Sequence, residues 1–377
     1  VPHVPGRYPV YMERAQGSHV WDVDGNEYVD WMSGYGCILL GHAYPEVDAA
    51  AIAQMRKGFI SLLSNPLQNE LAEALIEMVP CAEMVRFFKT GTDATTAAVR
   101  IARIHTGRDM VVRWGYHGWA DWSLSTMPEF NAGVPQSTRE LVHTFRYNDL
   151  DSLREVFQQH PGRIACLIMM PFETELPKEG FLEGARDICH GHGAVFIFDE
   201  IRSGFRMAPG GAQQYFGVVP DMAALSKGMA NGYAISAVVG KQEVMQAVEK
   251  GLFSATFFSS SMEMAASIAT LRIVRERGVV EHIWRIGNKL QAGLRELCAA
   301  SPLEVEVVGA PPMPFLQFRE SDREAKMEFY AEAAARGVYF HPGHHWFVNF
   351  SHTDEDVERT LEACQKAFAA AAAARSC

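Results

Sequence analysis

Two charged residues in the middle of the chain, an aspartate and a lysine, have side chains that could take part in catalysis. Asp199 comes directly after the five apolar residues 194–198, and Lys227 stands 28 positions later in LSKGMANG. A carboxylate that ends such a run is expected to be desolvated, so it needs a cationic partner: an internal arginine or lysine, or a protonated heterocycle. Lys227 could be an ordinary solvated loop residue. Alternatively, it could be an amine with a lowered pKa that forms an imine.

Two glycine-containing segments follow earlier apolar runs and could contact a phosphorylated aromatic ligand. The segment 89–94, KTGTDA, leads into a predicted helix, where the unpaired N–H groups of a glycine-containing turn could bind a phosphate. Thr92 could instead simply cap that helix. In the segment 115–119, GYHGW, the ring of Tyr116 could lie flat on a ligand ring or could fill the core.

Together these features fit one cofactor, pyridoxal 5′-phosphate (PLP), whose chemistry needs all four parts. The glycine-containing turn would bind the phosphate, and the aromatic side chain would stack on the ring. The carboxylate would keep the ring nitrogen protonated. The lysine would hold the cofactor covalently and move a proton during the reaction.

The elements that would position these residues alternate between strands and helices. Segments with a helical spacing of apolar residues separate short apolar runs, which predicts an α/β domain with a largely parallel sheet. The runs are 85–88, 110–114, 165–170, 194–198 and 234–240. In such sheets, ligands bind beyond the carboxyl ends of the strands. The first forty residues resemble strands, and the chain after about residue 260 is mainly helical.

Composition narrows the class of protein. The chain has 377 residues, with 34 lysines and arginines against 45 aspartates and glutamates, which gives a net charge of −11. This acidity disfavours binding to nucleic acid or to an anionic membrane, and no apolar run is long enough to span a bilayer. Seven scattered cysteines without a C-x-x-C pair predict neither a disulfide framework nor a zinc site, and they favour a cytoplasmic location. No secretory signal is visible, and because the chain opens at Val1, preceding residues could be missing.

At these residues the sequence resembles the class-III PLP-dependent aminotransferases of fold type I, and it is most similar to their glutamate-1-semialdehyde aminomutase-like branch. The most specific shared motif is the block DE-x-x-x-GFR with a lysine 28 residues after its aspartate. The resemblance covers essentially the whole chain through the segments GSHVWDVDGNEYVDW, LGHAYPEV, TGTDATTAAVRIARIHTGRD, YHG, YNDLDSL, GGAQQYFGVVPD, LSKGMANG, FSATFFSSSMEMAA and SHTDEDVERTL.

The resemblance implies a role for each position that matches the family pattern. Lys227 would form the Schiff base with the cofactor and shuttle the proton, and Asp199 would pair with the ring nitrogen. The resemblance also implies that Thr90, Gly91 and Thr92 bind the cofactor phosphate. Tyr116 and Ile201 would lie on the two faces of the ring, with His117 as a further cofactor-binding position beside Tyr116. Thr256 would reach the phosphate of the neighbouring subunit. The last of these contacts implies a homodimer with shared active sites.

Departures from the family pattern bear on the substrate. The aminomutase has an arginine in an S-P-V-R segment that binds the substrate carboxylate, whereas Arg7 lies in the different context VPHVPGRYPVY. The stretch 119–137 is also too short to hold the Gly/Ser-rich gating loop of the aminomutase. Both differences argue against a true aminomutase. Glu173, Arg202 and the segment 341–346, HPGHHW, could each contact substrate or have a structural role.

These observations predict a fold type I α/β protein with three parts. The N-terminal part of a small domain would cover 1–44, a large PLP-binding domain with a mostly parallel seven-stranded sheet would cover 45–260, and an α+β C-terminal part would cover 261–377. The predicted activity is a ping-pong transfer, through pyridoxamine phosphate, from a small-molecule amino donor to an aldehyde or ketone acceptor such as a sugar-type carbonyl compound. Two alternatives stay open: an aminomutase, and a PLP-binding homologue without catalysis.

Overall fold

The computed structural model describes residue 4 and residues 6–375, so Val1 and Cys377, both considered above, lie outside the described residues. The chain divides into two compact units. Unit 1 comprises Val1–Asp48, Thr174–Leu176 and Ile273–Cys377, and unit 2 comprises Ala49–Glu173 and Pro177–Arg272.

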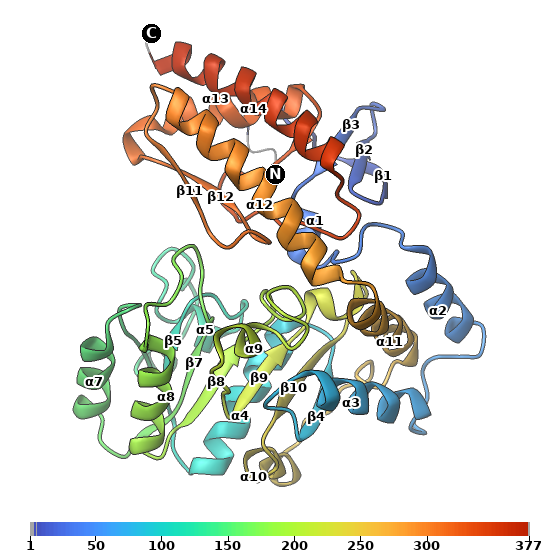
Figure 1. Ribbon diagram of the computed structural model, residues 1–377. Helices are drawn as coiled ribbons and strands as arrows, with labels where there is room; N and C mark the ends of the chain where they lie inside the picture. The colour runs from blue at the N-terminus through green and yellow to red at the C-terminus, as the bar shows by residue number, and fades with distance from the viewer. Residues whose placement is uncertain (1–3, 5, 376–377) are drawn as a thin grey trace. The chain divides into compact units, whose positions relative to one another are not determined.

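Unit 2 is built around a seven-stranded sheet with the strand order β4-β10-β9-β8-β7-β5-β6 (Figure 1). The strands are β4 (Met84–Phe88), β5 (Met110–Trp114), β6 (Val142–Thr144), β7 (Ile164–Met169), β8 (Val195–Asp199), β9 (Met222–Leu225) and β10 (Ser236–Gly240). Among these strands only β10 pairs antiparallel with its neighbours β4 and β9, and the other pairs are parallel. This arrangement confirms the predicted α/β class with a mostly parallel seven-stranded sheet.

The helices of unit 2 cover the sheet, whose central strands β7 and β8 are buried along their whole length. Burial on both faces explains why these strands are continuous apolar runs in the sequence. The α-helices are α3 (Pro66–Met78), α4 (Gly91–Thr106), α5 (Asp121–Leu124), α6 (Gln136–Arg139), α7 (Leu150–Gln159), α8 (Phe181–Gly191), α9 (Ala212–Phe216) and α10 (Gln242–Met245); the 3₁₀ segments are η1 (Lys227–Ala230) and η2 (Gln246–Lys250). Small side chains at Ala94, Ala97 and Ala98 let α4 pack closely against the sheet core.

Unit 1 is an α+β body with one four-stranded and one two-stranded sheet. Its strands are β1 (Met12–Gln16), β2 (His19–Asp22), β3 (Glu27–Asp30), β11 (Val305–Val308), β12 (Phe315–Phe318) and β13 (Val338–Tyr339). Its helical segments are α1 (Ser33–Gly36), α12 (Val279–Ala300), η3 (Glu320–Asp322), α13 (Arg323–Ala335) and α14 (Asp354–Arg375). Two helices, α2 (Pro45–Met55) and α11 (Ser261–Glu276), contain the residues at which the two units divide. None of the helices in the described part of the chain is both long and apolar enough to cross a membrane.

Candidate functional site

The residues predicted to carry chemistry converge at one edge of the sheet of unit 2. Asp199 is the last residue of β8, and Lys227 comes two residues after the end of β9. The segment that contains Thr90 follows β4, and the segment that contains His117 follows β5. Because these four strands run in the same direction, their carboxyl ends lie on the same edge, where ligands of such sheets bind.

Asp199 and His117 form a buried pair at this edge. His117 Nδ1 lies 2.7 Å from Asp199 Oδ2, although 82 residues separate the two in sequence. The other carboxylate oxygen, Oδ1, accepts a hydrogen bond from the backbone N–H of Ile201 at 3.1 Å. The sequence predicts a cationic partner for Asp199, either an internal arginine or lysine or a protonated heterocycle; the protein residue that contacts its carboxylate is His117, whose lowered pKa disfavours the cationic form. The sequence had singled out His117 only through its resemblance to a cofactor-binding position.

The imidazole of His117 is fixed from several sides. Thr95 Oγ1 donates a hydrogen bond of 2.7 Å to the His117 carbonyl, and the ring stacks on Trp122 with centroids 5.9 Å apart. Burial lowers the pKa of His117, the neighbouring Arg113 lowers it further, and Asp199 acts in the opposite direction. Among the described residues, none accepts or donates a hydrogen bond at the buried Nε2 of His117.

The start of α4 has the geometry of an anion site. Thr90, not Thr92, caps the helix: Thr90 Oγ1 accepts from the Asp93 N–H at 3.2 Å, and the Asp93 carboxylate accepts from the Thr90 N–H at 2.8 Å. The alternative in which Thr92 is the cap is therefore wrong. The N–H groups of Gly91 and Thr92 belong to the first turn, where backbone donors have no partner within the helix and favour an anion.

Two glycines show how closely the surrounding segments approach this helix start. A Cβ atom on Gly91 would lie 2.8 Å from Ile201 Cδ1, and a Cβ atom on Gly118 would lie 2.1 Å from Thr92 Oγ1. Side chains at these positions would thus collide with the segments after β8 and β4. The backbone N–H groups at the start of α4 suit a phosphate, and the buried Asp199 carboxylate suits a basic ring nitrogen. The residues present therefore fit PLP.

Lys227 has an unusual backbone for a residue other than glycine. Its φ of 46° lies in the left-handed region, a conformation that costs about 1–3 kcal/mol and persists only where the surroundings impose it. Ser226 Oγ donates 3.0 Å to the Ile235 carbonyl, and Ser267 Oγ donates 2.9 Å to the Met229 carbonyl. These contacts hold the turn on both sides of Lys227, whose own side chain is half-buried.

Glu200, the residue after Asp199, has a structural role. It is completely buried, and burial raises its pKa, while hydrogen bonds from the first residues of α9 favour the ionised form. Its Oε2 accepts from the Ala212 N–H at 2.6 Å, and its Oε1 accepts from the Gln213 N–H at 2.9 Å. Glu200 thereby ties the end of β8 to α9.

Arg202 is likewise engaged within the protein. Its Nη2 donates a hydrogen bond of 2.8 Å to the Phe172 carbonyl, and its Nη1 lies 3.9 Å from Glu173 Oε1. Burial lowers the pKa of its guanidinium, and the Glu173 carboxylate opposes this effect. Of the two alternatives for Arg202 and Glu173, these contacts favour the structural one.

Two predicted cofactor residues of unit 2 stay open to solvent in the single chain. Tyr116 is 54% exposed, and Thr256 lies in an exposed turn without a hydrogen bond to any described residue. Their roles against the ring and at a neighbouring phosphate remain predictions.

The other candidates belong to unit 1. Arg7 pairs with Glu328 at 2.6 Å and with Glu332 at 2.9 Å, so its guanidinium is occupied by protein carboxylates. In the segment 341–346, the ring of His344 meets that of Tyr35 edge to face with centroids 4.8 Å apart, and Trp346 is completely buried. The described residues contain no group of three potential ligands that could hold a metal ion.

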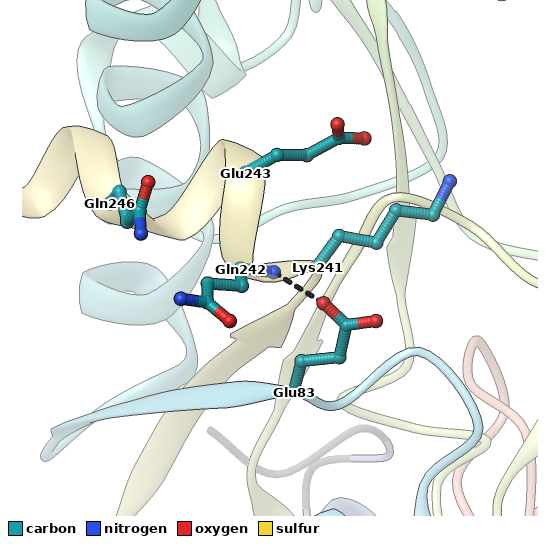
Figure 2. Close-up of a pocket in the computed structure, with 5 residues that line it drawn as sticks. All are labelled: Glu83, Lys241, Gln242, Glu243 and Gln246. Carbon is teal, nitrogen blue, oxygen red and sulfur yellow. Dashed lines mark hydrogen bonds between the residues drawn. The ribbon is translucent and has the colours of Figure 1, made fainter.

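A polar pocket of about 460 Å³ also lies in unit 2, but at the opposite edge of the sheet (Figure 2). Glu83 precedes β4 and Lys241 follows the antiparallel β10, so both stand where the parallel strands begin. In this pocket the Glu83 carboxylate accepts from the Gln242 N–H at 2.7 Å, while Lys241 Nζ binds Asp221 at 2.7 Å. Its groups are therefore separate from Lys227 and Asp199.

Comparisons with known proteins show the family of this chain. The model of the family "Aminotransferase class-III" matches residues 3–368. The chain is 40% identical to a 3-aminobutyryl-CoA aminotransferase of Cloacimonas acidaminovorans (strain Evry), over 97% of this chain and 90% of the relative. It is 35% identical to a glutamate-1-semialdehyde 2,1-aminomutase of Syntrophobacter fumaroxidans (strain DSM 10017 / MPOB), over 96% and 91% of the two chains.

Solved structures show the same fold. The FumI protein of Sphingopyxis sp. MTA144, in its PLP internal aldimine form, superposes with a TM-score of 0.93 at 35% identity, over 97% of this chain and 90% of that one. An omega-transaminase from Sphaerobacter thermophilus gives a TM-score of 0.91 at 25% identity, over 97% and 92%. The chain therefore belongs to the class-III aminotransferase family, and it is a fold type I transaminase whose cofactor is PLP.

Proposed function

We propose that this enzyme transfers an amino group from a small-molecule donor to an aldehyde or ketone in two half-reactions, and that Lys227 and Asp199 carry the chemistry. The observation that carries the proposal is their placement at the carboxyl ends of adjacent strands, with Lys227 held at a φ of 46° and Asp199 buried. Residues other than glycine that are held in such strained backbone conformations are found preferentially at functional sites. A desolvated carboxylate, in turn, suits a protonated ring nitrogen.

In this proposal each group of the chain has a defined task. The N–H groups of Gly91 and Thr92 bind the cofactor phosphate, and Ile201 and Tyr116 flank its ring. Asp199, oriented by the hydrogen bond of His117, keeps the ring nitrogen protonated. When bound, PLP withdraws electrons from the substrate carbon that bears the nitrogen and so makes its proton acidic. Lys227 Nζ takes that proton and returns it.

Two observations support a choice among possible acceptors: the ion pairs of Arg7 and the name of one relative. Arg7 donates three hydrogen bonds to Glu328 and Glu332, which supports an acceptor other than a simple α-keto acid whose carboxylate Arg7 would bind. The 40% identical relative is named for 3-aminobutyryl-CoA. We therefore place the 3-oxo acyl thioester that corresponds to such an amine first among acceptors, ahead of a sugar-type carbonyl compound.

We also propose that the enzyme is a homodimer in which Thr256 reaches the phosphate of the neighbouring subunit. Apolar side chains of unit 2 are exposed in the single chain: Leu62, Leu63, Leu252 and Phe257. Contiguous exposed apolar surface marks protein interfaces, and a contact between subunits on this part of unit 2 would cover these side chains. Sedimentation analysis that finds only monomers at assay concentrations contradicts the dimer.

A second candidate is an aminomutase, which moves nitrogen within one substrate. It is favoured by the 35% identity to a glutamate-1-semialdehyde 2,1-aminomutase. An aminomutase turns over without any external amino donor or keto acid, whereas the proposed aminotransferase stops after one half-reaction under those conditions.

The test is an absorption spectrum of the purified enzyme, titrated with amines that include glutamate, alanine, diamines and 3-aminobutyryl-CoA. We expect a yellow band that one donor bleaches and that a matching carbonyl compound restores. If cofactor binds but no amine changes the spectrum, and no substrate turns over alone, both catalytic proposals fail.

A further inference from the structure

A pocket of about 460 Å³ in unit 1 combines cationic and apolar side chains. It lies around the start of α13 and between the end of β12 and the segment that follows β13. Its lining includes the cationic Arg319, Arg323 and Lys326 and the carboxylate of Glu320. The volume is in the range of pockets that hold small organic ligands.

The positive charges of this pocket are incompletely neutralised. Arg323 and Lys326 stand three positions apart in α13, so their side chains leave the helix on the same face. Neither has an ion pair or a hydrogen-bonded carboxylate among the residues that the structure describes. Burial lowers the pKa of Lys326, the charge of Arg323 lowers it further, and Glu320 only partly opposes these effects.

The third cation, Arg319, is held only loosely. Its ion pair with Glu304 has both side chains at least half exposed, and exposed pairs contribute little free energy. An anionic ligand could therefore draw Arg319 from Glu304 at small cost. Among the lining residues, three cations stand against one carboxylate, that of Glu320.

We propose that this pocket binds the phosphate groups of a phosphorylated small molecule, with Arg323 and Lys326 as the principal contacts. Guanidinium and ammonium groups form strong charge-assisted hydrogen bonds with phosphate oxygens. The apolar surface of Phe318, Met327 and Pro342 adds a wall for an organic part of the same ligand. This mixed lining favours a phosphate ester over free phosphate.

The proposed function suggests which phosphate ester this is. If the substrate is an acyl thioester of coenzyme A, the nucleotide part of that molecule carries phosphate groups of the kind that the pocket would bind. This identification rests on the proposed function, whereas the binding of phosphate groups does not.

The experiment measures binding by isothermal titration calorimetry, without turnover. The enzyme is first saturated with PLP, so that no probe occupies the cofactor phosphate site. The probes are coenzyme A, inorganic pyrophosphate, glucose 6-phosphate and pantetheine, which lacks the nucleotide. The variants are R323A/K326A and, as a control that removes the same two charges from exposed positions elsewhere, R154A/K366A. Unfolding temperatures verify that both variants are folded.

We expect coenzyme A to bind the wild-type enzyme and the control equally, and to bind R323A/K326A about tenfold more weakly or worse. Arg323→Lys should retain most of the affinity. Tight binding of coenzyme A, with weak binding of pyrophosphate and pantetheine, supports the thioester identification. Equal binding of glucose 6-phosphate and coenzyme A supports the phosphate site and overturns that identification.

Unchanged affinities in R323A/K326A, or no binding of any phosphate probe to the wild-type enzyme, would overturn the proposal. Failure of the proposed function is seen separately, because it requires that no amine changes the absorption spectrum. Binding at this pocket can persist in that case, so the two failures are distinguishable.

Discussion

His117 Nδ1 lies 2.7 Å from Asp199 Oδ2, and both side chains are almost fully buried. The pair joins the segment after β5 to the end of β8 and, together with the Ile201 N–H, fixes the direction of the Asp199 carboxylate. A hydrogen bond from a neutral imidazole favours the ionised carboxylate. His117 is therefore a positioning residue for the group that we propose to pair with the ring nitrogen of the cofactor.

Replacing His117 tests this role. We expect His117→Phe to lower kcat about tenfold at saturating PLP, because the Asp199 carboxylate loses the donor that directs it. His117→Asn keeps an N–H donor and should restore much of the activity. Equal kcat values for His117→Phe and His117→Asn would show that the contact has only a packing role.

Lys227→Ala should reduce turnover on the order of 10³-fold or more, because the substitution removes the amine that we propose to carry the proton. The variant should still bind PLP through the start of α4, without the yellow band of the wild-type enzyme. Lys241→Ala, at the opposite edge of the sheet, is the matched control and should remain active. Turnover by Lys227→Ala at the wild-type rate is incompatible with the proposed mechanism.

Asp199→Asn preserves shape and removes charge. We expect activity to fall about 100-fold or more, since a neutral amide does not hold a proton on the ring nitrogen. Kinetic constants and cofactor affinity should be measured together, so that weak cofactor binding is separated from slow chemistry. Unchanged kinetics at saturating PLP would remove Asp199 from the mechanism.

The close approach of Gly118 to Thr92 predicts a stability effect. Gly118→Ala places a methyl group 2.1 Å from Thr92 Oγ1 at a φ of +96°, so it should lower the free energy of unfolding by about 2–4 kcal/mol. Gly133 has a similar φ of +84° but nothing within 4 Å of its added Cβ. Gly133→Ala should therefore cost only about 1 kcal/mol. If urea unfolding shows that Gly118→Ala and Gly133→Ala lose the same free energy of unfolding, the structure near Thr92 adjusts easily to the added methyl group.

Unit 1 should lose stability in mild acid through His352. Burial lowers the pKa of His352 to about 4, and its ring stacks on Trp31 with centroids 4.1 Å apart. The unfolded chain protonates this histidine near pH 6.5 while the folded one does not, so the free energy of unfolding falls between about pH 6.5 and pH 4, by about 1.4 kcal/mol per pH unit.

The dependence of the unfolding temperature on pH, compared between variants, isolates the contribution of His352. His352→Asn should show a shallower decline of unfolding temperature between neutral and mildly acidic pH than the wild-type protein. His105→Asn, at an exposed position of α4, should leave the decline unchanged. Parallel pH curves for wild type and His352→Asn would assign the acid sensitivity to other groups.

The sequence by itself determined the fold class, the family and the strands that end at the site. Asp199 and the apolar run before it are adjacent in the chain, and so are Lys227 and its small neighbours; local patterns of this kind reflect burial and turn formation directly. The spacing of these motifs then identified the cofactor, since few chemistries need all of them at once.

Only the tertiary structure decided which distant groups meet. His117 reaches Asp199 across 82 residues, and Arg7 reaches Glu328 across 321, because strand order and helix packing create contacts that no local pattern encodes. The same holds for the antiparallel direction of β10 and for the pocket of Arg323 and Lys326. The cap at Thr90 rather than Thr92 depends on where the backbone turns into the helix, which residue type alone does not specify.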